Sequence, residues 1–134
     1  MIRAGGWICL APVVAMSPAA PPAFGQNVKP ISTSLAECAV IYTEIAGLRP
    51  ARRRSPEKQE LMYAGAELFA EEAVRQASAE GIADPEAHVR DLRADLATKW
   101  SGRMSSLLKL RENVDWIEYC AALGEDRGLL PLED

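Results

Sequence analysis

Residues 34–45 read SLAECAVIYTEI, and this stretch decides the fold that the sequence predicts. Four of its apolar residues recur at intervals of three or four, which is the spacing of one helix face: Leu35, Cys38, Tyr42 and Ile45. Val40 and Ile41 widen the apolar surface, so the helix is expected to be largely buried.

The two ends of this helix carry local signals. Ser34 followed by Glu37 is the S-x-x-E pattern of a capping box, in which both side chains accept hydrogen bonds from backbone N–H groups at the helix start. Gly47 is a typical residue after the last helical turn, and Pro50 prevents the helix from resuming. The sequence therefore predicts a first helix over 34–47.

Two more helices begin with a proline signal. Ser55-Pro56 and Asp84-Pro85 each place a polar N-cap before a proline, whose missing N–H is not needed at the first helical position. The predicted ranges are 56–80, followed by Gly81, and 85–110. The third helix carries apolar residues at helical spacing along its length: Val89, Leu92, Leu96, Trp100, Met104 and Leu107.

The third predicted helix contains one glycine and carries opposite charges at i,i+4 spacing. Gly102 is expected to loosen or kink it, because a glycine inside a helix costs about 1 kcal/mol relative to alanine. Asp95 and Lys99 are expected to form an i,i+4 ion pair on its exposed side.

A fourth helix is predicted over 113–123, closed by Gly124 and followed by a tail that docks on the other helices through Leu129, Leu130 and Leu132. No segment shows the alternation of a strand. The predicted fold class is all-α, a small antiparallel bundle of about four helices in one domain, 26–134. Its last helix is expected to turn four residues inwards: Val114, Ile117, Cys120 and Ala121.

The first 25 residues differ from the rest. Arg3 is their only charged residue, and the apolar stretch 7–16 is too short for the roughly 20 residues that span a bilayer. A section rich in proline and alanine follows and ends with small residues. This pattern predicts a secretory signal peptide, 1–25, cleaved between Gly25 and Gln26, with an uncleaved anchor as the alternative. We therefore expect a periplasmic or secreted protein that has no membrane span after processing.

Cleavage would remove Cys9 and leave two of the three cysteines. In an oxidising compartment two cysteines favour one disulfide. The first and last helices of an up-down bundle are antiparallel neighbours, which brings Cys38 and Cys120 to the same level. The sequence predicts a Cys38–Cys120 disulfide, with two buried free thiols as the alternative. A redox pair is usually C-x-x-C, and a zinc site needs about four ligands.

The chain has a formal charge of −4, from 15 basic and 19 acidic residues. An acidic domain gives no reason to expect a nucleic-acid partner, because nucleic-acid binding requires a basic face. The local exception lies between the first two predicted helices. Four arginines lie there: Arg49, Arg52, Arg53 and Arg54. We predict that they bind an anionic ligand or an acidic protein, with a solvated loop as the alternative.

The sequence marks no catalytic or cofactor site. His88, the only histidine, is expected at the surface and has no recognisable nucleophile or orienting partner. A haem-carrying bundle would want a second ligand such as Met62 or Met104, but both fall on core-facing positions.

Two further groups of residues are expected to have a structural role and not a catalytic or binding role. Glu67, Glu71 and Glu72 are predicted to form an outer polar face, with Glu71 paired to Arg75. Three aromatic side chains are expected to complete the core rather than line a groove: Trp100, Trp116 and Tyr119.

These observations favour a small exported binding, interaction or accessory protein of the cell envelope. We expect no enzymatic activity, no cofactor and no metal, and a partner that is an unknown protein or an anionic ligand. The alternative is a cofactor-carrying helical bundle of the haem type, or an enzyme whose site the sequence does not reveal.

Overall fold

The computed structural model describes residues 29–48 and 55–131, which form five helices and contain no strand. The predicted all-α class is therefore confirmed for this part of the chain. The predicted signal peptide, its predicted cleavage position between Gly25 and Gln26, and the four arginines of segment 49–54 lie outside the described residues. The helices are α1 (Ile31–Ala46), α2 (Pro56–Ala79), α3 (Pro85–Trp100), α4 (Leu107–Glu112) and α5 (Val114–Asp126).

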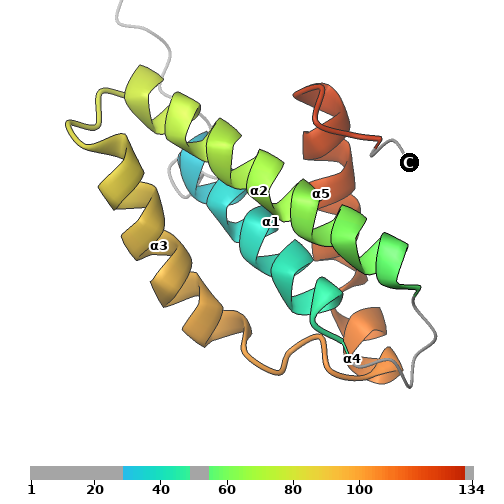
Figure 1. The fold of residues 1–134 in the computed structure, drawn as a ribbon. Coiled ribbons are helices and arrows are strands. Elements are labelled where there is room, and N and C mark those ends of the chain that lie inside the picture. Colours follow the sequence, from blue (N-terminus) through green and yellow to red (C-terminus); the bar gives the residue numbers. More distant parts are fainter. Residues whose placement is uncertain (1–28, 49–54, 132–134) are drawn as a thin grey trace, which may run out of the picture.

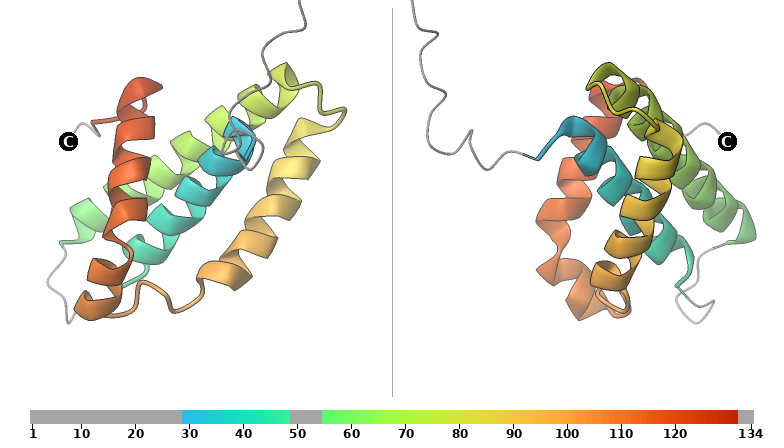
Figure 2. Two further views of the ribbon diagram at one scale, coloured as in Figure 1. Left: turned by 180° about the vertical axis from the view of Figure 1, so that it is seen from behind. Right: turned by 90° about the vertical axis from the view of Figure 1, so that its left-hand side faces the viewer.

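α1 is the central helix, with α2, α3 and α5 around it (Figures 1 and 2). Twelve of its sixteen residues are buried, as the apolar composition of 34–45 predicts. The long helix α2 packs along α1 in the opposite direction and contributes small buried residues, which let the two backbones approach closely. Those residues are Gly65, Ala66, Ala70, Ala73 and Ala77.

The proline signals at the starts of α2 and α3 are confirmed. The Ser55 hydroxyl accepts a hydrogen bond from the Lys58 backbone N–H at 3.3 Å, and the Asp84 carboxylate accepts one from Ala87 at 3.1 Å. Gly81 follows the end of α2 with a φ of +85°, a left-handed conformation that side chains disfavour.

The capping box predicted for the first helix is wrong. α1 begins at Ile31, so Ser34 and Glu37 lie inside the helix and are buried. The α1 start is bound from another helix: the Ser32 backbone N–H and hydroxyl donate to the Glu80 carboxylate at 3.3 and 2.6 Å. A carboxylate from the end of α2 thus occupies the favourable position at the α1 N-terminus.

The predicted single helix over 85–110 is also wrong, because α3 ends at Trp100. Gly102 has a φ of +73°, which takes the backbone out of the helix and explains why there are five helices rather than four. Met104 is still buried, as expected, but Leu107 is 72% exposed on the separate helix α4. Val114, expected to face inwards, is also exposed.

The last helix extends past its predicted end. Gly124 lies buried inside α5, which continues to Asp126. A Cβ at Gly124 would lie 2.5 Å from Leu130 Cδ1 and 2.9 Å from Phe69 Cζ, so the glycine permits close packing instead of ending the helix. Leu129 and Leu130 pack against the core as predicted, whereas Leu132 lies outside the described residues.

The Cys38–Cys120 disulfide joins the first and last helices, as predicted. Its Cα atoms are 5.5 Å apart, within the range of unstrained disulfides, and both cysteines are fully buried. Each lies near the middle of its helix, because α1 begins earlier and α5 ends later than the sequence signals suggest. The disulfide holds α5 covalently against the central helix.

Candidate functional site

The most unusual side chain in the interior is Glu37, a fully buried carboxylate on α1. Its Oε1 accepts hydrogen bonds from Lys99 Nζ at 2.6 Å and from the Trp100 indole Nε1 at 2.8 Å. Its Oε2 accepts one from Lys29 Nζ at 2.8 Å. A buried charge is stable only when it is paired and hydrogen-bonded, and Glu37 meets both conditions.

These contacts set the charge state of Glu37. Burial alone would raise its pKa, but the hydrogen bonds from Lys29, Lys99 and Trp100 favour the carboxylate and lower the pKa below the ordinary value. The predicted Asp95–Lys99 pair on the outside of α3 is wrong, since the Lys99 ammonium binds Glu37 across the α1–α3 interface.

Aromatic rings surround the two lysines. Lys29 and Lys99 lie over the Trp116 ring, 5.2 and 5.5 Å from its centroid, and Trp116 contacts Trp100 edge to face. Trp100 is buried in the core as expected, but Tyr119 is exposed. The Glu37 carboxylate itself has no exposed surface, so no substrate can reach it. We interpret this cluster as the polar link that orients α3 and the segment before α1 on α1.

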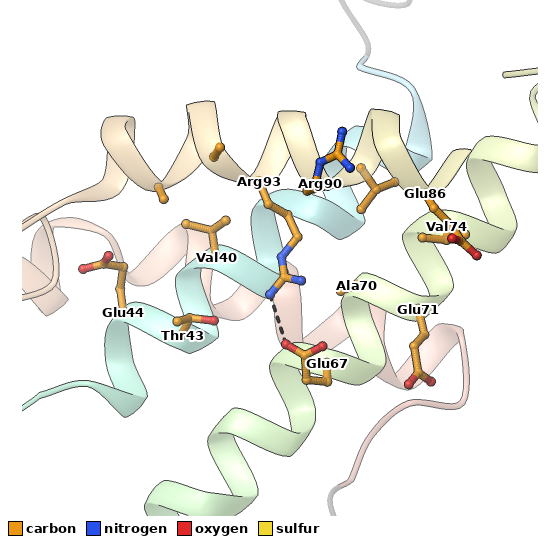
Figure 3. A pocket seen from close by; sticks show the side chains of 13 residues that line it. Val40, Thr43, Glu44, Glu67, Ala70, Glu71, Val74, Glu86, Arg90 and Arg93 are labelled. Carbon is orange, nitrogen blue, oxygen red and sulfur yellow. Dashed lines mark hydrogen bonds and ion pairs between the residues drawn. The ribbon is translucent and has the colours of Figure 1, made fainter. Parts of the chain in front are cut away.

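A surface groove lies on another side of α1, where α2 and α3 diverge (Figure 3). It has a volume of about 520 Å³. The residues of its floor are apolar and small, and they leave space between the helices unfilled. They are Val40, Ala70, Val74, Val89, Ala94 and Ala97.

The rim of the groove is charged. Glu67 on α2 and Arg93 on α3 form an ion pair of 3.1 Å across it (Figure 3). The other charged residues of the lining are Glu44, Glu71, Glu86 and Arg90. Four carboxylates and two guanidinium groups give the lining a formal charge of 2 − 4 = −2.

The structure divides the three glutamates of the predicted polar face. Glu67 and Glu71 line the groove, whereas Glu72 binds Arg75 at 2.6 Å. The predicted Glu71–Arg75 pair is therefore wrong, because i,i+3 geometry brings Glu72 to the arginine. The sequence reveals the acidic residues but not the groove, which depends on the angle between α2 and α3.

The other candidate residues lie apart from the groove floor. His88 is exposed on α3, as expected, and Met104 is part of the core. Within 29–48 and 55–131, no three histidine, cysteine, aspartate or glutamate side chains are placed to hold a metal ion. None of the helices in the described ranges has both the length and the apolar composition needed to cross a bilayer.

Comparison of the chain with protein-family models, curated proteins and solved structures finds no match. We therefore infer function from the geometry of the groove and from the exposed surfaces of the helices.

Proposed function

We propose that the protein is a non-enzymatic binding protein of the cell envelope, exported by its leader and processed to a single domain of antiparallel helices, 26–134. Its binding site is the groove between α2 and α3. The disulfide supports this proposal, because such bonds persist in oxidising compartments outside the cytosol.

The occupant that the groove fits is an amphipathic helix of a partner protein. The α3 residues of the lining recur at helical spacing from Glu86 to Ala97, a length of roughly 16 Å at 1.5 Å per residue. About three turns of a partner helix fit along this length. A helix that lies in a groove is recognised through residues at this same spacing.

The chemistry of the lining predicts which residue types the partner helix carries on its inner face and on its flank. The floor of alanine and valine accepts small apolar residues, because it leaves room for a close helix–helix approach. The acidic side of the rim, formed by Glu67 and Glu71 on α2, attracts lysine or arginine on the facing flank of the partner helix, and opposite charge at a rim raises the association rate and selects the partner. The single observation that carries the proposal is this combination of an open apolar floor and an acidic rim.

Photocrosslinking in the native envelope tests the proposal. A photoreactive amino acid replaces Ala97 or Ala94, two exposed residues of the lining, and Ala122 on α5 serves as the control position. We expect both groove positions to give the same adduct, with a protein segment that forms a basic amphipathic helix. Ala122 should not give it.

A second variant tests the rim. Glu67→Lys with Glu71→Lys should abolish the adduct, because it reverses the charge of the α2 rim without altering a buried residue. Equal adducts from Ala97 and Ala122, an adduct that persists in the lysine variant, or no adduct from either groove position would overturn the proposal.

A further inference from the structure

The short helix α4 exposes two adjacent leucines. Leu107 is 72% exposed and Leu108 is 66% exposed, and none of the six residues of α4 is buried. Leu110 is partly buried and packs against the core, so it holds α4 in place while the first two leucines face solvent. α4 lies at one end of the described part of the molecule (Figures 1 and 2).

The surroundings of these leucines are basic, although the chain as a whole is acidic. Residues 96–111 contain four basic residues and no acidic one. Lys99 binds Glu37, but Arg103, Lys109 and Arg111 form no ion pair with any described residue. Arg103 also lies over the Trp100 ring, 4.4 Å from its centroid, but all three side chains are exposed and have no carboxylate partner in the described ranges, so their charge is available to an anionic partner.

Two of these cations line a small polar cleft between α3 and α4, with a volume of about 350 Å³. The cleft is bordered by Ser101, Gly102, Arg103, Lys109, Glu112 and Asn113. Among these residues, the negative charge of Glu112 disfavours the binding of an anion. Asn113 donates to the Arg103 and Lys109 carbonyls at 3.2 and 2.9 Å, and the Lys109 ammonium donates to the Gly102 carbonyl at 3.0 Å. These bonds hold the cleft wall together next to the exposed leucines.

We propose that this end of the molecule, defined by Leu107, Leu108, Arg103, Lys109 and Arg111, binds the surface of an anionic membrane. The two leucines would enter the boundary between head groups and acyl chains, and the cations would contact the lipid phosphates. An interfacial helix binds an anionic bilayer through two contributions: the burial of apolar side chains and the attraction of basic side chains to anionic lipids.

The size of the surface favours a membrane over a protein partner. A stable protein interface buries about 800 Å² on each partner. Two leucine side chains supply only a small part of such an area, whereas shallow insertion into a bilayer requires few apolar residues when cations surround them. This inference does not depend on the helix-binding groove, which lies elsewhere on the molecule.

Co-sedimentation with lipid vesicles tests the proposal on the exported, oxidised protein. We expect binding to vesicles of phosphatidylglycerol mixed with phosphatidylcholine, little binding to phosphatidylcholine alone, and a decrease with salt. Leu107→Ser with Leu108→Ser should weaken binding by roughly tenfold or more. Arg103→Glu or Lys109→Glu should weaken it at least about fivefold, the factor that corresponds to one cation near an anionic leaflet.

Matched controls carry equivalent changes on other surfaces. Tyr63→Ser with Leu68→Ser removes two exposed apolar side chains from α2, and Arg75→Glu reverses an exposed cation on the same helix, outside the groove lining. Both should bind as the unchanged protein does. The proposal fails if anionic vesicles do not bind the protein, if the leucine variant binds normally, or if the leucines instead mediate self-association without lipid.

Discussion

α1 and α4 are both rich in apolar residues, yet α1 is largely buried and α4 is not. α1 buries twelve of its sixteen residues, including the charged Glu37. α4 buries none of its six, although three of them are leucine. Composition alone therefore does not decide burial in this protein.

The difference comes from the position of each helix among its neighbours. α1 has α2, α3 and α5 around it, so even a carboxylate on it must find partners in the interior. α4 follows the left-handed turn at Gly102, and of its three leucines only Leu110 packs against the core. We infer that the buried residues of α1 serve stability, and we propose that the groove and the exposed surface of α4 serve binding. Four measurements can contradict or refine this division.

The largest effect is expected from the disulfide that joins α1 to α5. Replacing Cys38 and Cys120 with alanine should lower the free energy of unfolding by about 4.5 kcal/mol, the chain-entropy value for a closed loop of 82 residues. Urea unfolding of the oxidised protein and the variant measures this difference. An unchanged midpoint, or two titratable thiols in the unreduced denatured protein, would contradict the expectation.

Leucines of the two helices provide the most direct comparison. Leu35→Ala should cost about 3 kcal/mol, because this side chain is fully buried and its loss leaves a cavity. Leu107→Ala should change stability by less than about 0.5 kcal/mol, since the side chain is exposed. Thermal or urea unfolding of both variants tests the contrast, and equal costs would show that α4 packs as tightly as α1.

Glu37→Ala tests the polar interior of α1. We expect a loss of about 2 to 3 kcal/mol, less than for an entirely buried ion pair because Lys29 and Lys99 can regain water. Trp100 would still lose the only hydrogen-bond partner shown for its indole N–H. Glu44→Ala, on the same helix but partly exposed, is the control and should cost less than about 0.5 kcal/mol. If both variants lose the same stability, the buried cluster contributes nothing specific.

The smallest effect concerns pH. The pKa of Glu37 is lowered in the folded protein, so its contribution to stability is present above the ordinary glutamate pKa of about 4.3 and is lost as the pH falls through the folded-state value. Glu37→Gln has no such titration. The stability difference between the two proteins should therefore be larger at neutral pH than in acid, as urea unfolding at both pH values can determine. A constant difference would exclude Glu37 as the titrating group.

The sequence predicted the features that depend on neighbouring residues. The starts of α2 and α3 follow from Ser55-Pro56 and Asp84-Pro85, since an N-cap bond reaches only three residues along the chain. The disulfide was also predictable, because only two cysteines follow the predicted signal peptide and an up-down helical arrangement brings the first and last helices together. By contrast, the capping box at Ser34 failed because a carboxylate 48 residues away binds the start of α1.

By itself, the sequence determined the all-α class, the starts of α2 and α3 and the pairing of Cys38 with Cys120. Only the tertiary structure decided that Glu37 binds Lys99 and Trp100, residues 62 and 63 positions away, and that α2 and α3 leave an open groove. The physical reason is range. Helix signals act within about one turn, whereas ion pairs, grooves and exposed leucines depend on how complete helices pack against one another.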